Sequence, residues 1–353
     1  MALVGPFPPP YGGMAVYYSS LEVGLRAAGM EPVRVPVPYA AVGGVRRHLG
    51  RVAIFARAAW RVLADRPNVV HCITGSQPNL IGNVLPLVAA RVVRRPSVLS
   101  IVGGEFPSAA RAYRGARRLL VRFIVSRPRL VIACTTEIAE AVRFLGIPKG
   151  RIVVLTNALP ARLDPRADQE LPPEVAPFAD AHEPLVASIS GWYDYYGSQD
   201  LVEAVRRLRA DLPQIGLVLM VKGGGDPDFR ARLLAEVRAG GLDDAVLVRE
   251  DERAVLGVMR RADAVVRTPH HEGDAISVRE ALAVGAPVVA SDVGLRPPGV
   301  VRYRPADPDD LTSRLGEVLA AGRRSDAAAD GEREGESNLA FLIDAYRRLA
   351  DAD

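Results

Sequence analysis

The sequence has few of the features that mark secreted or membrane-spanning proteins. It contains only two cysteines in 353 residues, Cys72 and Cys134, and both lie in apolar runs that resemble strands. Two cysteines are too few for a disulfide framework, so we expect two buried, reduced thiols. No apolar run approaches the roughly 18 residues that cross a bilayer, and no secretory leader is evident. These absences predict a cytoplasmic protein.

Patterns that bind metal ions are also scarce. The chain has five histidines, and none of them stands near a cysteine at a spacing typical of metal ligands. The adjacent pair His270 and His271 cannot both face one ion from a regular strand, because successive side chains point to opposite faces. We therefore expect no metal ion and no organic cofactor.

Charge is abundant and unevenly distributed. The net charge is +4, but residues 1–165 contain 22 Lys and Arg against 7 Asp and Glu, a net of +15. The remainder contains 23 basic and 34 acidic residues, a net of −11. A split of this size indicates an anionic partner for the first half and a domain boundary near residue 165. The alternative to an anionic partner is that this protein simply uses arginine on all of its solvent-exposed faces.

Short apolar strands alternate with amphipathic helical segments, a pattern that predicts parallel sheets built from βαβ units. The predicted domains are residues 1–165 and 185–335, joined by a linker at 166–184 that is rich in Pro, Ala and acidic residues. Residues 321–336 are predicted to form a loose loop, and 336–353 a closing C-terminal helix. The predicted strands are residues 2–5, 69–73, 98–102, 130–134, 152–155, 185–190, 216–221, 245–248, 264–267 and 287–290.

The first motif that suggests chemistry is the loop after the first strand. Three prolines stiffen it, Gly12 and Gly13 follow, and a helix is predicted to begin there. Glycines allow the backbone to approach a ligand, and the free N–H groups of a helix start attract phosphate. Proline and glycine also form ordinary turns, so this motif alone is weak.

The second motif, residues 270–294, is more specific. Glu272 and Glu280 flank a glycine-containing loop and a predicted helix start, where backbone N–H groups could hold a phosphate and the carboxylates could accept hydrogen bonds from sugar hydroxyls. One alternative is that Glu280 closes a capping box with Ser277. Another is that Glu272 is a solvated loop residue. The loop and helix start between the two glutamates contain Gly273, Asp274, Ala275 and Ile276.

These motifs together resemble glycosyltransferase family 4, whose members have the GT-B fold. The resemblance rests on the Glu272 and Glu280 pair, the following GAPVVASDVG, the Gly12–Gly13 loop and NALP at 157–160. It implies an α/β protein with two Rossmann-like domains facing each other across a cleft, the first binding an acceptor and the second a nucleotide-sugar donor. It further implies a retaining, metal-independent sugar transfer to a hydroxyl group.

The resemblance also implies roles for individual residues. Glu280 would bind the donor ribose, Glu272 the donor sugar during catalysis, and the loop between them phosphate and sugar. Gly12 and Gly13 would approach the diphosphate from the first domain.

The chain departs from the family pattern at several positions. Trp192 and Tyr196 replace an arginine and a lysine that bind the donor pyrophosphate in relatives, so we expect Lys222 or Arg267 to substitute, although both could be surface cations. Val102 replaces a histidine near the transferred sugar. The expected acceptor-side residues are His71, Ser76, Gln77 and Glu105, with a structural role as the alternative for His71 and a plain loop acid for Glu105.

These departures leave other functions open: a catalytically inactive homologue that acts as a binding or partner subunit, and a nucleotide-sugar epimerase of the same fold.

Two arginine-rich segments suggest where the chain meets its anionic partner. Residues 46–66 interleave six arginines and one histidine with Phe55 and Trp60, and Arg111, Arg114, Arg118 and Arg122 suggest one basic stripe on a helix. Basic amphipathic helices attract acidic lipids. We expect a protein peripheral to the inner face of the cell membrane, acting on a lipid-linked acceptor. No aromatic stacking platform or known motif indicates nucleic acid.

Overall fold

The chain folds into two compact units of parallel α/β structure. The structure is a computed structural model, and it describes residues 1–9, 11–37, 44–164, 166, 168–250, 254–322 and 328–351, without the side chains of 44–49 and 222–224. The N-terminal unit comprises Met1–Leu163, Glu272–Asp274 and Gly335–Asp353. The C-terminal unit comprises Asp164–His271 and Ala275–Glu334. The chain therefore enters the N-terminal unit a second time at 272–274 and a third time in its last helix.

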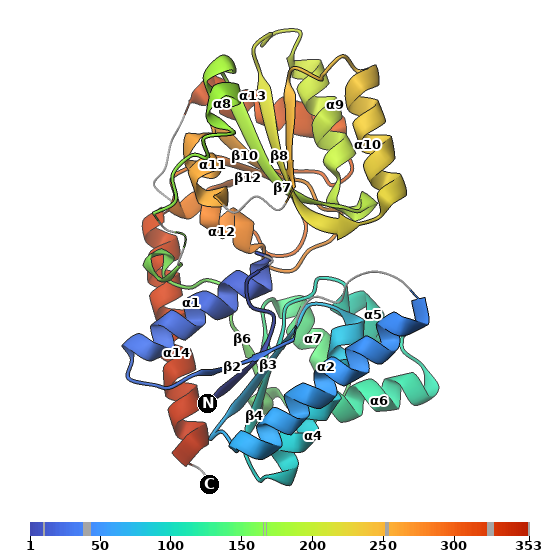
Figure 1. Cartoon of the computed structure of the whole chain (residues 1–353), viewed down its shortest axis with the longest axis vertical. Helices are drawn as coiled ribbons and strands as arrows, with labels where there is room; N and C mark the ends of the chain where they lie inside the picture. The colour runs from blue at the N-terminus through green and yellow to red at the C-terminus, as the bar shows by residue number, and fades with distance from the viewer. Residues whose placement is uncertain are drawn as a thin grey trace. The chain divides into compact units, whose positions relative to one another are not determined.

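The N-terminal unit is built on a six-stranded parallel sheet with the order β2-β1-β3-β4-β5-β6 (Figure 1). Its strands are β1 (Ala2–Gly5), β2 (Val33–Pro36), β3 (Val70–Thr74), β4 (Ser97–Ile101), β5 (Leu130–Ala133) and β6 (Ile152–Val154). Its helices are α1 (Gly13–Ala27), α2 (Gly44–Asp65), α3 (Gln77–Gly82), α4 (Val84–Val92), α5 (Phe106–Ala112), α6 (Gly115–Val125), α7 (Thr136–Phe144) and the greater part of α14 (Ala328–Asp351).

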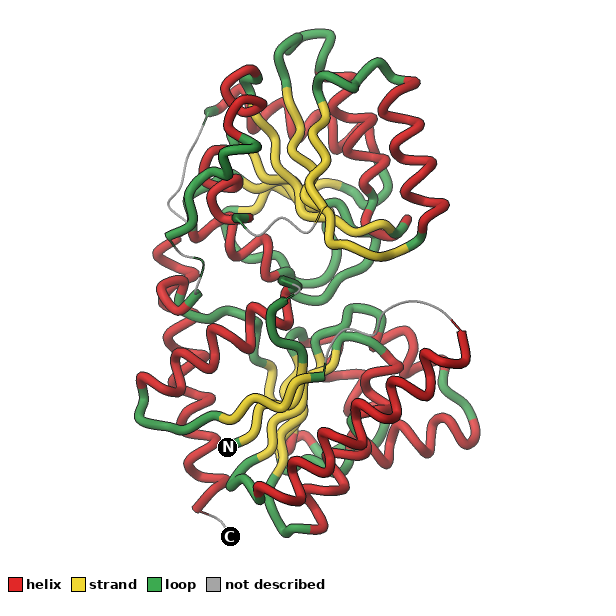
Figure 2. The backbone as a smooth tube through the Cα atoms, viewed as in Figure 1, coloured by secondary structure: helices red, strands yellow, loops and turns green. Residues whose placement is uncertain are grey.

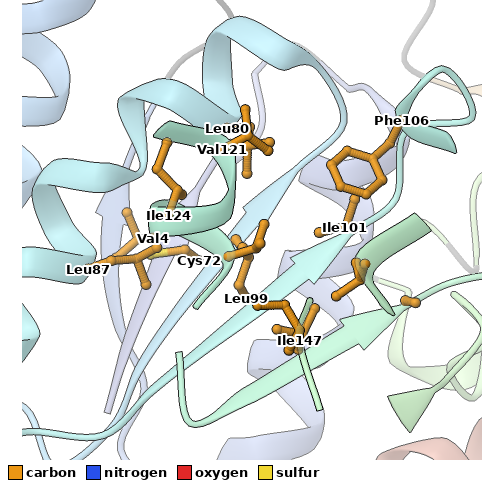
Figure 3. Packing of buried hydrophobic residues seen from close by; sticks show 14 of the residues in the cluster. Val4, Cys72, Leu80, Leu87, Leu99, Ile101, Phe106, Val121, Ile124 and Ile147 are labelled. Atoms are coloured by element: carbon orange, nitrogen blue, oxygen red, sulfur yellow. The ribbon is translucent and has the colours of Figure 1, made fainter. Parts of the chain in front are cut away.

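Helices cover both faces of this sheet, which explains why every residue of its central strands β3 and β4 is buried. In Figure 1, α1 and α14 lie on one side of the sheet, and α2, α4 and α6 lie on the other. Figure 3 shows the core on the second side, where Leu87 of α4 and Ile124 of α6 lie near Cys72 of β3. Both cysteines are buried and neither forms a disulfide bond, as the sequence predicted.

The C-terminal unit repeats the architecture with the order β12-β11-β10-β7-β8-β9, and Figure 2 shows its strands enclosed by helices. Its strands are β7 (Leu185–Trp192), β8 (Gly216–Gly225), β9 (Val246–Glu250), β10 (Ala264–Arg267), β11 (Val288–Ser291) and β12 (Val300–Tyr303). Its helices are α8 (Ala176–Ala181), α9 (Ser198–Leu208), α10 (Pro227–Ala239), α11 (Val255–Arg261), α12 (Ile276–Ala283) and α13 (Pro308–Ala321). This strand order is typical of Rossmann folds.

Several helices begin at residues that favour a helix start. The Thr135 hydroxyl accepts a hydrogen bond from the Ile138 amide at 3.3 Å at the start of α7. Asp226 and Asp307 accept equivalent bonds at the starts of α10 and α13, each followed by a proline in the first turn. Such side chains satisfy amide groups that have no partner within the helix, and proline at this position sacrifices no hydrogen bond.

The sequence predictions of two Rossmann-like α/β domains and of ten strands are confirmed. Two strands were missed, β2 and β12, and both lie at sheet edges. The loose loop expected at 321–336 is wrong in its second half, because α14 begins at Ala328; residues 323–327 lie outside the described part of the chain. Residues 166–184 contain α8, whose Ala179 packs in the core of the C-terminal unit. None of the described helices combines the length and apolar content needed to span a bilayer.

Candidate functional site

The topology indicates where ligands would bind in each unit. In a parallel α/β sheet, ligands bind beyond the carboxyl ends of the strands, at the point where the strand order reverses. This point lies between β1 and β3 in the N-terminal unit and between β7 and β10 in the C-terminal unit. The loops that follow β1, β3 and β10, with the helix starts to which they lead, contain most of the donor-binding and acceptor-side residues that the sequence singled out.

In the N-terminal unit, glycines allow the loops at this edge to pack backbone against backbone. A Cβ atom at Gly103 would lie 2.4 Å from the Gly75 carbonyl oxygen, and one at Gly104 would lie 2.3 Å from the Glu272 carbonyl carbon. A Cβ at Gly273 would lie 2.5 Å from the carbonyl oxygen of Val102. No side chain fits at these distances. The glycine pair Gly103–Gly104, which follows β4, thus allows the segment 272–274 to pack closely against this loop.

Asp274 fixes this segment to the end of β6. Its carboxylate accepts a hydrogen bond from the Asn157 amide at 2.6 Å, and its backbone carbonyl accepts one from the Asn157 side chain at 2.9 Å. Asp274 is buried, so these bonds are shielded from water. The sequence placed Asp274 among the donor-binding residues and noted Asn157 only as part of a turn.

The loop after β1 ends at Gly12, which occupies the N-cap position of α1 in an extended conformation. No side chain caps this terminus, and its first turn contains no acidic residue. Gly13 is exposed there. The amide groups at this helix start are thus compatible with the predicted contact to phosphate.

The expected acceptor-side residues divide into two groups. Ser76 and Glu105 are exposed at the N-cap positions of α3 and α5, which follow the neighbouring strands β3 and β4. Gln77 accepts a hydrogen bond from Arg117. His71, in contrast, is fully buried within β3.

The acceptor role expected for His71 is therefore wrong, and the structural alternative holds. One ring nitrogen lies 2.7 Å from the Ser100 hydroxyl and the other 2.8 Å from the Tyr346 hydroxyl. Burial lowers the pKa of His71 to about 3, so the ring is neutral at physiological pH. Because both nitrogens are occupied inside the core, the side chain is not accessible to an acceptor.

In the C-terminal unit, Glu280 lies on α12 in a buried ionic cluster. Its carboxylate pairs with Arg166, whose guanidinium also binds Asp164 at 2.8 Å. The side chains of Glu280 and Arg166 are only 11% and 5% exposed. Burial raises the pKa of Glu280, whereas Arg166 opposes that rise. The sequence did not indicate Arg166.

The start of α12 does not have the capping-box geometry considered for Glu280. The helix begins at Ile276 with Ala275 as its N-cap residue, so Ser277 already lies inside the first turn. No side chain caps this helix start. The terminus is thus available to an anionic group, preceded by Gly273 and Asp274.

The positions where the family pattern is lost are filled by aromatic side chains. Trp192 is buried in the core of the C-terminal unit, and the Tyr196 ring packs against Gly191 at the end of β7. The Arg267 guanidinium lies 5.1 Å from the centre of the Tyr196 ring and donates a hydrogen bond to the Ile189 carbonyl at 2.6 Å. Arg267 thus belongs to this edge of the sheet. The side chain of Lys222 lies outside the described part of the structure.

The two loops at the switch point of the C-terminal unit are joined to each other. The Thr268 hydroxyl donates to the Tyr196 carbonyl at 2.7 Å, and the His270 amide donates to the Tyr195 carbonyl at 2.8 Å. Gly197 adopts a left-handed conformation with φ 64°, and a Cβ there would lie 2.1 Å from the Thr268 carbonyl oxygen. The loop after β7 is therefore held against the loop that leads to Glu272.

The basic stripe predicted over residues 111–123 is wrong as a single helix. Helix α5 ends at Ala112, and α6 begins at Gly115 after an extended residue at Arg114. Arg111 and Arg122 therefore belong to different helices. The other arginine-rich segment, 46–66, lies almost entirely in α2, where Phe55 is buried in the core and Trp60 is 62% exposed.

Comparisons with known proteins agree with this arrangement. Residues 12–158 match the family described as "Glycosyl transferase 4-like domain", and residues 183–321 match "Glycosyl transferases group 1". A D-inositol 3-phosphate glycosyltransferase of Arthrobacter sp. (strain FB24) is 26% identical over 326 residues, which cover 80% of this chain and 74% of that protein.

Solved structures show the same fold at lower identity. Anabaena HepE in complex with UDP-glucose matches with a TM-score of 0.71 at 15% identity, covering 100% of this chain and 99% of HepE. Sucrose-phosphate synthase of Thermosynechococcus elongatus matches with a TM-score of 0.70 at 17% identity, over 100% and 99% of the two chains. From its two matched domains and its fold, the chain belongs to the family 4-like, group 1 glycosyltransferases with the GT-B fold.

Proposed function

We propose that this glycosyltransferase moves a sugar from a nucleotide-diphosphate sugar to a hydroxyl acceptor, with retention of anomeric configuration and without a metal ion. The product would belong to glycolipid, polysaccharide or glycoconjugate synthesis. One observation carries the proposal. A single segment between β10 and α12 contains Glu272, Gly273 and the buried Asp274, leads into an uncapped helix start, and continues to the largely buried carboxylate of Glu280.

Each part of this segment suits one part of a nucleotide-sugar donor. Amide groups at the start of α12 can bind phosphate oxygens, because a helix N-terminus attracts negative charge. The carboxylate of Glu280 can accept hydrogen bonds from ribose hydroxyls, and that of Glu272 from sugar hydroxyls. In this proposal Arg166 keeps Glu280 ionised in its buried position, and it orients the carboxylate that meets the ribose.

The diphosphate also needs positive charge, which relatives supply from positions occupied here by Trp192 and Tyr196. Arg267 is the proposed replacement, because its guanidinium lies beside the Tyr196 ring at the carboxyl end of β10. A guanidinium can bind two phosphate oxygens at once. Together with the α12 amides it would offset the charge of the leaving diphosphate, so no metal ion is required. Gly12 and Gly13 are the proposed contacts on the N-terminal unit, and Lys222 is the second candidate cation.

The proposed mechanism relies on positioning and on stabilisation of the leaving group. The acceptor hydroxyl would attack the anomeric carbon on the face from which the diphosphate departs, and the leaving phosphate would take the acceptor proton. The protein would hold both substrates in line for reaction and exclude water. Ser76, Gln77 and Glu105 are the proposed acceptor-side residues.

The similar proteins support the choice of donor and of acceptor chemistry. HepE was solved with UDP-glucose, and the Arthrobacter relative is a D-inositol 3-phosphate glycosyltransferase. A UDP-sugar is therefore the first donor to test, and hydroxyls on phosphorylated or lipid-linked carbohydrates are the first acceptors.

The proposal can be tested by calorimetric titration of UDP, GDP, ADP and TDP. One nucleotide should bind, and Glu280→Gln should weaken it about 10- to 100-fold, because a hydrogen bond to a charged group contributes roughly 1.5–3 kcal/mol. Glu317→Gln on α13, an exposed residue, is the matched control. Glu272→Gln should mainly lower turnover, and Arg267→Ala should weaken the nucleoside diphosphate far more than the nucleoside.

Two other outcomes would replace the proposal. If no nucleotide binds, the chain is an inactive homologue that serves as a binding or partner subunit, a function favoured by the loss of the usual cations at Trp192 and Tyr196. If the sugar nucleotide is isomerised or hydrolysed without an acceptor, the chain is an epimerase. If Glu280→Gln lowers stability but leaves affinity unchanged, the assignment of ribose to Glu280 is wrong.

The N-terminal unit is also proposed to work at an anionic membrane. Helices α2, α4 and α6, on one side of its sheet, expose apolar side chains among their arginines. Trp60, Val92 and Leu119 are 62%, 67% and 68% exposed. Large apolar residues exposed among basic ones are typical of surfaces that bind acidic lipids.

A further inference from the structure

A second concave site lies at the opposite edge of the N-terminal sheet, where the strands begin. This is the edge at which β1 starts beside the N label in Figure 1. The cavity has a volume of about 710 Å³ and is lined by Ser97, the first residue of β4, and by residues that directly precede β5 and β6. Six of its lining residues are arginines, and none is acidic: Arg91, Arg94, Arg95, Arg127, Arg129 and Arg151. We refer to this cavity as the arginine pocket.

The charges of the arginine pocket are not neutralised by the described part of the protein. None of the six arginines forms an ion pair with a described acidic residue. Arg151 donates hydrogen bonds to the Ser126 carbonyl at 2.7 Å and to the Pro128 carbonyl. Burial lowers the pKa of Arg151, and the nearby charges of Arg127 and Arg129 lower it further. The fold therefore gathers like charges at a repulsive cost.

A purely structural role explains only part of this cluster. Helices α4 and α6 end at the pocket, and cations near a helix C-terminus interact favourably with its dipole. This accounts for Arg91 in the last turn of α4 and for Arg151, which binds carbonyl groups that follow α6. It leaves Arg94 and Arg129 unexplained.

Arg94 in particular occupies a position that favours glycine. It follows α4 in a left-handed conformation with φ 57°, within a turn closed by the Arg95 amide donating to the Ala90 carbonyl at 2.8 Å. Glycine fits this turn without strain, whereas other residues lose about 1 kcal/mol or more. A cation kept at a strained position, beside five others, indicates a requirement for charge at this place.

We propose that the arginine pocket binds an anion that carries at least one phosphate group and two or more negative charges. Planar guanidinium groups match phosphate oxygens in pairs, and several of them together suit a diphosphate or a phosphomonoester. The cavity is large enough for a ligand of this kind. The ligand is either free in solution or the headgroup of an acidic phospholipid.

Apolar side chains at the rim make both sources chemically reasonable. The Arg127 guanidinium lies 4.3 Å from the centre of the exposed Phe123 ring. Val92, the last residue of α4, is also exposed next to Arg91. The shared chemistry is phosphate recognition, and the experiment separates the two sources.

This site does not depend on the proposed donor reaction. The arginine pocket lies at the amino ends of β4, β5 and β6, whereas the candidate donor and acceptor residues follow the carboxyl ends of strands. A ligand held in the pocket would attach or regulate the protein and would take no part in sugar transfer. If the proposed phosphate binding at the arginine pocket is disproved, the glycosyltransferase assignment is therefore unaffected, and the two results can be told apart.

The test compares two double variants that each remove two positive charges. Arg91→Ala/Arg129→Ala alters the pocket at two exposed arginines. Arg347→Ala/Arg348→Ala alters two exposed arginines of α14, which belongs to the same unit but lies on the other side of its sheet from α2, α4 and α6. Inorganic pyrophosphate is titrated by calorimetry at fixed ionic strength. Hydrogen–deuterium exchange then locates the response in peptides that span residues 91–97 and 126–131. A donor-site contribution, if present, is common to all three proteins.

Pyrophosphate should slow hydrogen–deuterium exchange in these peptides in the wild type and in the control. The pocket variant should bind pyrophosphate at this site at least tenfold more weakly. In a second arm, vesicles with phosphatidic acid are compared with neutral vesicles. If only vesicle binding depends on Arg91 and Arg129, the ligand is a lipid headgroup; if only pyrophosphate binding does, the ligand is soluble. If both probes affect the pocket variant and the control equally, the proposal is overturned.

Discussion

At the scale of single residues, the buried polar side chains of this protein fall into two classes. Some satisfy only each other, as His71 does between Ser100 and Tyr346. Others are bonded to residues far away in the sequence and belong to the proposed donor site, as Asp274 does through Asn157 and Glu280 through Arg166. The first class affects stability and its pH dependence, whereas the second is expected to affect binding.

His71 gives a prediction for stability as a function of pH. Its pKa is about 3 in the folded protein and about 6.5 in an unfolded chain. Between these values the unfolded chain binds a proton that the folded protein excludes, so this contribution to stability is present above the unfolded pKa and is lost as the pH falls. From pH 7 to pH 5, this one residue should lower the free energy of unfolding by about 2 kcal/mol.

Urea denaturation of the wild type and of His71→Gln, followed by circular dichroism at the two pH values, measures this difference. Other groups titrate equally in both proteins, so the variant should lose about 2 kcal/mol less than the wild type on acidification. Parallel losses in the two proteins would mean that His71 titrates normally in the folded state.

The sequence identified one side of each polar pair at the candidate site. Glu280 and Asp274 could be found because both belong to one short motif, in which Glu272 and Glu280 flank a glycine-containing loop that includes Asp274. Arg166 and Asn157, their partners, are 114 and 117 residues away along the chain. No local pattern connects such pairs, and only the folded sheet brings them together. His71 was misjudged for the same reason, since Tyr346 lies 275 residues beyond it.

At the scale of elements, central strands were predictable and edge strands were not. Strands such as β3 and β4 are buried along their whole length and are mostly apolar in sequence. β2 and β12 are only four residues long, lie at sheet edges and are partly exposed, so their pattern is weak. The break between α5 and α6 was missed because arginines at helical spacing continue across it.

Gly104 gives a prediction about the loop that carries Glu272. A Cβ at this position would lie 2.3 Å from the backbone of Glu272, so Gly104→Ala must displace the segment 272–274 within the N-terminal unit. We expect a loss of roughly 1–3 kcal/mol in stability together with reduced turnover. Thermal unfolding and a sugar-transfer assay measure the two effects.

Gly50→Ala is the matched control for this substitution. Gly50 lies inside α2 with nothing within 4 Å of an added Cβ. Alanine is the better helix former there, so this variant should gain about 0.5–1 kcal/mol and leave turnover unchanged. A Gly104→Ala protein as stable and active as Gly50→Ala would contradict the assigned loop packing.

At the scale of the whole molecule, charge and exposed apolar surface point to the same half of the chain. Residues 1–165 carry a net charge of +15, and the remainder carries −11. The exposed apolar residues Trp60 and Leu119 belong to α2 and α6 of the N-terminal unit. An acidic membrane would attract this unit and repel the acidic remainder of the chain. Uniform use of arginine on solvated faces remains the competing explanation, and it predicts no lipid dependence.

The two explanations differ in how the protein responds to vesicles. Each Lys or Arg near an anionic membrane contributes about 1 kcal/mol, and this attraction weakens as salt screens it. Cosedimentation should therefore occur with anionic vesicles, be absent with neutral ones, and decline from low to moderate ionic strength.

Trp60 gives a second test of the same membrane contact. Its insertion into the bilayer should shift its fluorescence to shorter wavelength. Because the chain has two tryptophans, Trp192→Phe removes the other one and leaves the Trp60 signal alone. Trp60→Ala should weaken binding roughly tenfold through lost apolar burial, whereas Val23→Ala, at an exposed residue of α1 on the other side of the sheet, should not. Equal binding to neutral and anionic vesicles would remove the membrane from the proposed function and leave a soluble acceptor as its substrate.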